Sequence, residues 1–350
     1  MKRIAASALT ALISLTALAP QPVRAEAETT LTIASWAPPT HVANSQMWPA
    51  FIERLEEITD GRVTAEVKLG LAPPPAMADL VLDGAADITY IFHGYNPGRF
   101  VTAQLAELPG VEGTAEAVSA AYWDVWRDHL AAAGEQREFK TLAMFTHGPA
   151  QLHLADPISG LADVEGLKLR SPGGVGAQVL SALGGIGIQV PATKVYETLS
   201  ARAADGVTMN IDSRLGFKLD EVAPVMFEVP GGLYRGSFAV LMNRDRWEAL
   251  PEDIREKLDA ELVGAPLSRL FGKLWDGGDA VARESTQANS GPILVASEED
   301  LALFAPIVTQ AREEVLARIA EKGIDAAAAK AQFDRRVAQV MAETGDGDRE

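Results

Sequence analysis

The 350-residue sequence contains no cysteine, and this absence excludes cysteine nucleophiles, thiolate metal sites and disulfide bonds together. Positive charge is also scarce: 31 Lys and Arg stand against 48 Asp and Glu, which gives a formal net charge of −17. A chain this acidic lacks the basic patch that nucleic acids require, and it has no overall attraction to an anionic membrane surface. We therefore expect neither nucleic acid nor a membrane surface as a partner.

The common catalytic and cofactor motifs are absent as well. The sequence has no Gly-x-Ser-x-Gly elbow, no His-Glu-x-x-His and no P-loop. Gly174-Val-Gly176 resembles the start of a dinucleotide loop but lacks the third glycine, and the five histidines show no metal-ligand spacing. Acidic pairs such as Glu56-Glu57 are typical of solvated helix faces. We therefore expect no resident cofactor.

The N-terminus carries the one long apolar run. Lys2 and Arg3 precede a run of small and aliphatic residues from 5 to 19, and Val23-Arg24-Ala25 offers small residues at a cleavage site. This pattern predicts a signal peptide over residues 1–25. The alternative is an uncleaved anchor, but the run is shorter than the about 20 residues that a membrane span needs. We expect export to the periplasm and no membrane insertion of the mature chain.

The remaining sequence alternates strand patterns with helix patterns, which predicts an α/β protein with largely parallel sheets covered by helices. A chain of this length suggests about two domains. The predicted strands cover 31–35, 63–69, 87–92, 142–145, 166–170, 206–210 and 237–243. The predicted helices cover 47–58, 118–130, 178–183, 195–202 and most of the chain after Pro251.

Arg170 has the most informative position in the chain. It ends the predicted strand 166–170, and Ser171-Pro-Gly-Gly174 turns the chain into the next helix. Ligands of open α/β sheets bind beyond the carboxyl ends of strands, close to helix N-termini. A guanidinium at this place suits a carboxylate, because it can contact both oxygens. A plain surface arginine is the alternative.

Other predicted strands also end in loops with aromatic and polar side chains, which converge on one small-molecule site if the strand ends share an edge. These candidate binding residues are Trp36, His41, Tyr95, His147, Asn210, Asp212 and Arg214. Structural packing is the alternative interpretation for the two aromatic residues.

The sequence resembles the substrate-binding proteins of tripartite ATP-independent periplasmic (TRAP) transporters, of the DctP type. The resemblance runs from about Leu31 to beyond Trp275, and its most specific part is Val164-Glu-Gly-Leu-Lys-Leu-Arg-Ser-Pro172. Other matching stretches, in order, are Ser35-Trp-Ala-Pro-Pro-Thr-His41, Tyr95-Asn-Pro-Gly-Arg-Phe100, Glu107-Leu-Pro109, Ala203-Ala-Asp-Gly-Val207, Phe217-Lys-Leu-Asp-Glu-Val222 and Pro230-Gly-Gly-Leu-Tyr234.

The resemblance implies a two-lobed fold like that of periplasmic binding proteins, in which each lobe is a mostly parallel sheet flanked by helices. It implies a hinge and a long helix that crosses both lobes. It also implies that Arg170 holds a ligand carboxylate and that Phe217 and Tyr234 lie at the site. The expected boundaries are 26–148 plus about 239–285 for lobe 1, 149–238 plus about 286–344 for lobe 2, and a flexible tail over 345–350.

Two departures from the family pattern concern the ligand. Many relatives have a second Arg or a Gln near Gly148 to His153, where this chain offers Gln151. Close relatives read Pro-Trp-Glu where this chain reads Asn210-Ile-Asp212. In some relatives that Trp and Glu contact the ligand or a bound cation, so a ligand-bridging cation at Asp212 is one alternative and a ligand with hydroxyl groups is another.

These observations predict an extracytoplasmic receptor that binds a small organic acid between two lobes and delivers it to a TRAP membrane permease for ion-gradient-driven uptake. Two alternatives stay open at this level. One is an exported hydrolase with carboxylate acid/base groups, and the other is the binding protein of an ATP-driven importer.

Overall fold

The computed structural model describes residues 27–289 and 291–347, with side chains up to 344. The predicted signal peptide lies outside this part of the chain, as do the last three residues of the predicted tail. Within the described ranges no helix has both the length and the apolar character needed to cross a membrane.

The chain folds around two sheets. The first has the strand order β2-β1-β3-β10-β4 and the second has the order β11-β9-β5-β8-β6-β7. The first sheet comprises β2 (Val63–Leu69), β1 (Thr29–Ser35), β3 (Ile88–Phe92), β10 (Ser237–Asn243) and β4 (Phe139–Thr146). The second comprises β11 (Ile293–Val295), β9 (Val225–Glu228), β5 (Gln151–Leu154), β8 (Gly206–Met209), β6 (Lys168–Ser171) and β7 (Ile186–Gln189).

The two lobes and the mostly parallel sheets are confirmed, and each sheet is mixed because it includes a strand that runs against the others. In the first sheet β1 pairs in parallel with β2 and β3, whereas β10 is antiparallel to both β3 and β4. In the second sheet β5 is antiparallel to β8 and β9. In the first sheet the chain returns from the second lobe as β10, which lies between β3 and β4. Its sequence Ser-Phe-Ala-Val-Leu-Met is fully buried, as a central strand requires.

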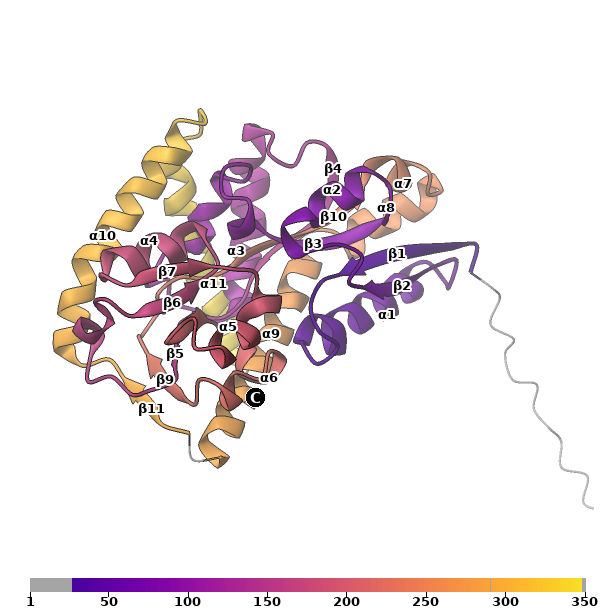
Figure 1. Ribbon diagram of the computed structural model, residues 1–350. Helices are drawn as coiled ribbons and strands as arrows, with labels where there is room; N and C mark the ends of the chain where they lie inside the picture. Colours follow the sequence, from indigo (N-terminus) through magenta and orange to yellow (C-terminus); the bar gives the residue numbers. More distant parts are fainter. Residues whose placement is uncertain (1–26, 290, 348–350) are drawn as a thin grey trace, which may run out of the picture.

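Helices flank both sheets (Figure 1). The helices are α1 (Trp48–Ile58), α2 (Met77–Leu82), α3 (Ala115–Asp128), α4 (Gly174–Ala182), α5 (Val195–Ser200), α6 (Ser213–Gly216), α7 (Arg244–Glu248), α8 (Glu252–Glu261), α9 (Ala265–Ala288), α10 (Glu298–Ala320) and α11 (Ala326–Gly347). Short helical turns that matter below are η1 (Ala43–Met47), η3 (His93–Tyr95) and η4 (Thr102–Glu107).

Before the C-terminal helices, the chain crosses between the lobes along residues 147–150, residues 229–236 and the long helix α9. The first two lie side by side, since Ala150 N–H donates to Tyr234 O (2.9 Å) and Leu233 N–H donates to Ala150 O (2.9 Å). Helix α9 packs on α3 and β4 of the first lobe and also touches α6 of the second. In Figure 1, α9 lies between the indigo strands β1 and β2 on the right and the strands of the second sheet on the left.

The two C-terminal helices divide their contacts. Helix α10 packs on α4 in the second lobe and on η4 in the first, whereas α11 packs mainly on α3 of the first lobe. The expected boundaries assigned both helices to lobe 2, so the packing of α11 differs from that expectation. Helix α11 also continues to Gly347, into the stretch expected to be a flexible tail. We propose a division in which α11 belongs with the first lobe.

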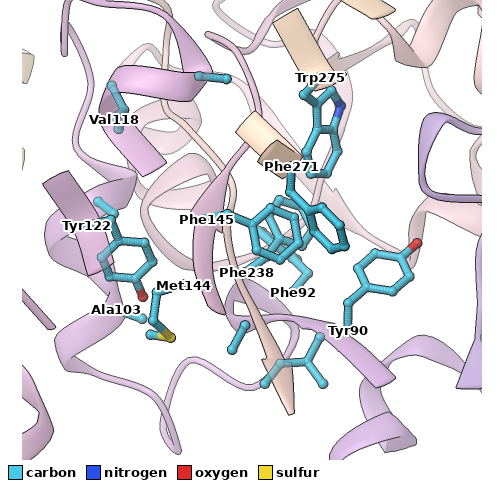
Figure 2. Packing of buried hydrophobic residues seen from close by; sticks show 14 of the residues in the cluster. Tyr90, Phe92, Ala103, Val118, Tyr122, Met144, Phe145, Phe238, Phe271 and Trp275 are labelled. Atoms are coloured by element: carbon cyan, nitrogen blue, oxygen red, sulfur yellow. The ribbon is translucent and has the colours of Figure 1, made fainter. Parts of the chain in front are cut away.

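The core of the first lobe is rich in aromatic side chains (Figure 2). Phe145 packs against Phe238 and Phe271, with ring centroids 5.3 and 5.2 Å apart. Trp275 of α9 lies 4.8 Å from Phe238. Because this cluster joins the sheet to the crossing helix, the wall that faces the second lobe rests on a closely packed core.

Candidate ligand-binding site

A pocket lies between the lobes, at the ends of strands from both sheets. It is lined by Trp36, His41, Phe92, Tyr95, His147, Arg170, Pro172, Ala192, Met209, Asn210, Ser213, Phe217, Tyr234, Phe238 and Trp275. The lining is apolar and aromatic apart from a few polar groups, as is usual for a small-molecule site. The cavity measures about 30 Å³. That volume holds a water molecule but not an organic acid, so a ligand can enter only when the lobes or side chains move.

Arg170 is the positive group of this pocket. It lies in β6 with 1% of its surface exposed, and its Nε–H donates to Val190 O at 2.8 Å. Its Nη2 is buried and has no hydrogen-bond partner among the described residues. A buried donor without a partner costs free energy, especially on a charged group. The side chain therefore has a place for an acceptor that the described part of the protein does not supply.

Aromatic rings form the wall opposite the second sheet. The Trp36 ring stacks on Tyr90 with centroids 4.8 Å apart, and its Nε1–H donates to Tyr90 O (3.2 Å). Phe92 and Phe238 stand opposite each other in the antiparallel pair of β3 and β10. Since each ring is held by the sheet or by a hydrogen bond, this wall is preformed for a flat apolar ligand.

His41 and Asp212 form the polar end of the site, one from each lobe. His41 Nδ1 accepts from Ala43 N–H (3.1 Å), which leaves the ring proton on Nε2, and burial lowers the pKa of His41 to about 3. His41 Nε2 lies 3.8 Å from Asp212 Oδ2, too far for a direct hydrogen bond. Asp212 Oδ2 is buried and has no hydrogen bond of normal geometry to another described residue, although the Trp275 side chain lies close enough to lower the pKa of Asp212. Both groups thus keep hydrogen-bonding capacity that a ligand atom beside them could use.

Asp212 has a second acid as a neighbour. Asp279 of α9 accepts from Asp212 N–H (2.7 Å) and from Asn210 Nδ2–H (3.2 Å). Burial, followed by the charge of Asp279, raises the pKa of Asp212 to about 8, while burial raises the pKa of Asp279 to about 7. Asp212 is therefore a neutral carboxylic acid at neutral pH, able to donate as well as accept.

Among residues 27–289 and 291–347, no three His, Asp or Glu side chains are arranged to hold a metal ion. The two neighbouring acids and the amide of Asn210 instead satisfy one another in part. Asp212 therefore enters the site as a hydrogen-bonding group, and the alternative of a bridging cation finds no cluster of ligands in the described chain.

Three of the predicted binding residues, Gln151, Asp212 and Arg214, are not part of the pocket lining, and other groups of the protein hold Gln151 and Arg214. The Gln151 side chain donates to Val229 O (3.2 Å) and accepts from Val229 N–H (2.7 Å). Arg214 donates to Thr286 Oγ1 (2.8 Å) and Pro224 O (2.9 Å), and contacts His153 Nδ1 at 3.2 Å. Both side chains are saturated in this arrangement, and they stabilise the second lobe and the connecting segments.

The other predicted residues are brought together, including His147, Asn210, Phe217 and Tyr234. His147 lies in a connecting segment, where its Nδ1 contacts Gly148 O (2.5 Å) and its Nε2 accepts from Gly236 N–H (3.0 Å). Sequence reasoning missed Phe92, Phe238 and Trp275. Each stands within an apolar strand or helix, where the sequence offered no sign that the pocket edge would fall there.

The lobes touch directly around the pocket. The Tyr95 hydroxyl of the first lobe accepts from Ala192 N–H of the second (2.8 Å), and Thr40 Oγ1–H donates to Gly216 O (3.2 Å). Since these contacts join the two lobes beside Arg170 and His41, the structure represents a closed arrangement.

Two lobes with an aromatic pocket and a buried arginine between them are the arrangement of a solute-binding protein. The sequence matches the DctP family, described as bacterial extracellular solute-binding protein, family 7, over residues 33–322, and the chain belongs to that family.

Three relatives show how similar known members are. A TRAP periplasmic solute-binding protein from Bordetella bronchiseptica, with bound (R)-mandelate and (S)-mandelate, is 34% identical, with a TM-score of 0.86 over 89% of this chain and 99% of that chain. A TRAP solute-binding protein from Rhodoferax ferrireducens, in complex with copurified benzoate, is 26% identical, with a TM-score of 0.83 over 90% of this chain and 99% of that one. The protein named outer membrane transporter protein TsaT, from Comamonas testosteroni, is 29% identical over 69% of this chain and 73% of its own length.

Proposed function

We propose that this protein is a periplasmic receptor for an aromatic monocarboxylic acid, which it binds between its lobes and delivers to a TRAP membrane permease. The observation that carries the proposal is the buried guanidinium of Arg170, with an unpartnered Nη2, at the edge of an aromatic pocket. A carboxylate would supply the missing acceptor, and the charge pair would be shielded from water.

The positive charge of the pocket lining matches a ligand with one carboxylate. Arg170 is the lining residue that carries a positive charge, because the lining histidines His41 and His147 have pKa values lowered by burial to about 3. The neighbouring acids Asp212 and Asp279, whose pKa values burial raises to about 8 and about 7, supply no positive charge for a second carboxylate. The aromatic wall suits a ring, and the relatives with mandelate and benzoate bind acids of that kind.

Ligand binding would close the lobes. A ligand shifts the open–closed equilibrium only through contacts that are better in the closed form. Arg170 and Asp212 belong to the second lobe and Trp36 and His41 to the first, so a ligand that touches both sets would bind the closed form more tightly. The permease would then recognise the closed receptor.

A calorimetric titration with benzoate, mandelate, phenylacetate and succinate tests the ligand class. We expect the aromatic monocarboxylates to bind and succinate, an aliphatic dicarboxylate, to bind at least tenfold more weakly. A preference for succinate, or turnover of any of these acids, would contradict the proposal. The exported-hydrolase alternative predicts turnover, and no observation favours it.

Uptake by cells separates the two kinds of transporter. Accumulation of labelled benzoate that stops when the ion gradients are dissipated, at unchanged ATP, supports a TRAP permease. Accumulation that instead follows the ATP level would assign the receptor to an ATP-driven importer.

The unused hydrogen-bonding groups of His41 and Asp212 predict that the protein prefers hydroxylated acids. A ligand hydroxyl beside these two side chains would accept a hydrogen bond from His41 Nε2–H and form a second one with the Asp212 carboxyl. One such bonding arrangement contributes about 1–1.5 kcal/mol, so mandelate is expected to bind roughly tenfold more tightly than phenylacetate, which lacks only the hydroxyl.

In Asp212→Ala the ratio of the affinity for mandelate to the affinity for phenylacetate should fall toward one. The affinity for benzoate, which has no hydroxyl, serves as the internal control. Calorimetry of the three acids against both proteins measures it. A mandelate to phenylacetate ratio that is unchanged in Asp212→Ala would show that the hydroxyl binds elsewhere.

A further inference from the structure

Glu107 makes a contact between the lobes that the site described above does not include. It is the last residue of η4 in the first lobe, and only 2% of its surface is exposed. Its Oε1 accepts from Ser237 Oγ–H of the same lobe (2.7 Å), and its Oε2 accepts from Val175 N–H of α4 in the second lobe (3.3 Å). A carboxylate of one lobe thus caps the first turn of a helix in the other.

Helix α4 begins directly after the strand that carries Arg170. On the connecting loop, a Cβ at Gly173 would come within 2.7 Å of Gly94 O, and a Cβ at Gly174 would come within 2.7 Å of Glu107 Oε2. Both glycines also have positive φ, +103° and +57°. The first lobe therefore approaches this loop so closely that its position in the closed form depends on Gly94 and Glu107.

A second polar bridge supports the same contact from the side of α10. Arg318 Nε–H donates to Gln104 Oε1 of η4 (2.9 Å), and its Nη2–H donates to Gln178 Oε1 of α4 (3.1 Å). The turn η4 and the helix α4 are thus joined at two places, of which the Glu107 contact is the one beside the Arg170 loop.

We infer that Glu107 is a positioning residue of the ligand site: it holds the start of α4, and with it Arg170, in the closed arrangement. This inference rests on the proposed function, in which the lobes close on a ligand. Opening of the lobes would remove Val175 from Glu107 and expose the carboxylate to water.

The surroundings of Glu107 give the direction of the pH dependence. Burial raises its pKa to about 7, against the opposing effects of Ser237, Val175 and the charge of Arg318. Three titratable groups near Glu107 are neutral: burial raises the pKa values of Tyr122 and Tyr234, and it lowers to about 3 the pKa of His93, which contacts the Ser237 hydroxyl that binds Glu107.

In the open form the pKa of Glu107 returns toward its ordinary value. Since the pKa is higher in the closed form, protonation favours closure. That contribution is complete below the open-form pKa and is lost as the pH rises through about 7. Between pH 5.5 and 8 the resulting loss of affinity is expected to be roughly tenfold or more.

The test is calorimetric titration of benzoate from pH 5.5 to 8 in buffers of different ionisation enthalpy, which also counts the protons taken up. Wild type should lose affinity with rising pH and take up protons on binding. Glu107→Gln, a neutral side chain of the same shape, should lose the part of both effects that Glu107 contributes. Asp212 and Asp279 titrate in the same range in both proteins, so the difference between the two profiles isolates Glu107.

Glu135→Gln is the matched control. Glu135 accepts from Val101 N–H (2.9 Å) and Thr102 N–H (3.0 Å) at the opposite end of η4, wholly within the first lobe. Its substitution should lower thermal stability and leave the wild-type pH profile in place. Identical pH profiles and proton counts for wild type and Glu107→Gln would overturn the inference and leave Glu107 as a structural cap.

Two further measurements cover the remaining outcomes. If Glu107→Gln does not fold, Ser237→Ala replaces it: loss of the Ser237 donor should move the midpoint of the pH profile upward, and an unmoved midpoint overturns the inference.

If wild type binds none of the aromatic acids, the proposed ligand class fails. Distances between spin labels on the two lobes, measured without ligand at pH 5.5 and 8, then decide: a pH-dependent approach that is lost in Glu107→Gln supports the role of Glu107, and equal distances contradict it.

Discussion

Replacing Arg170 by methionine is expected to lower the affinity for benzoate or mandelate by roughly 10²–10³-fold. The ligand carboxylate would be buried with its guanidinium partner, and removing one member of a buried charge pair costs about 3–5 kcal/mol. Methionine keeps much of the volume of the stem, and the structure uses only Nε of Arg170 for an internal hydrogen bond, to Val190 O. The ligand-free melting temperature should therefore change little.

Arg170→Lys should also bind poorly, because an ammonium group cannot form the two parallel hydrogen bonds that a planar guanidinium donates to both carboxylate oxygens. Calorimetry and ligand-free melting curves measure both variants. Binding by Arg170→Met within about threefold of wild type, less than ~1 kcal/mol, would show that Arg170 is not the anchor.

Arg214→Met is the contrasting variant. Arg214 is as deeply buried as Arg170, but its guanidinium donates to Thr286, Ala223 and Pro224 within the second lobe. Its loss leaves buried carbonyl oxygens without donors, so the main expected effect is a lower melting temperature. If Arg170→Met instead unfolds the ligand-free protein, Arg170 is structural and the anchor must be sought elsewhere.

Gly272→Ala is expected to destabilise the protein by about 2–3 kcal/mol. This is toward the upper end of what an added methyl group usually costs in a closely packed interior. Gly272 lies in the middle of α9, where a Cβ would come within 2.4 Å of Ala115 O and 2.7 Å of Glu116 Cα. These are backbone atoms at the start of α3, which cannot turn away as a side chain can. Asp276, one turn further along α9, also accepts from the N–H groups of Ala115 and Glu116, so a shift of α9 would strain this cap.

Gly277→Ala on the same helix is the control. A Cβ at Gly277 meets nothing within 4 Å, and the residue is exposed. Alanine favours a helix interior over glycine by roughly 1 kcal/mol, so this variant should be unchanged or slightly more stable. Calorimetric melting of both variants is the measurement. A Gly272→Ala protein as stable as Gly277→Ala would show that α9 and α3 can separate at no cost.

Much of the fold could be predicted because long elements carry their own pattern. Strand β10 and helix α1 were predicted over nearly the observed residues, since each has a sustained apolar repeat. The short strands β5, β7, β9 and β11 were not predicted. Each has only three or four residues, too few for a periodicity, and the edge strand β7 is largely exposed. The equally short β6 and β8 were predicted because a glycine, Gly166 or Gly206, marks where each apolar run begins.

For the site, the sequence by itself determined the kind of group and its place along the chain: an arginine at a strand end, next to a Gly-rich turn, in a cysteine-free and acidic protein. That much follows from the sequence because the end of a strand and the start of a helix are local features. Tertiary structure alone decided which buried arginine keeps a free guanidinium, because the carbonyl groups that saturate Arg214 come from other segments of the chain. It also decided that Phe238 and Trp275 line the pocket and that Glu107 reaches α4, since these contacts join residues far apart in sequence whose approach depends on how the two lobes pack.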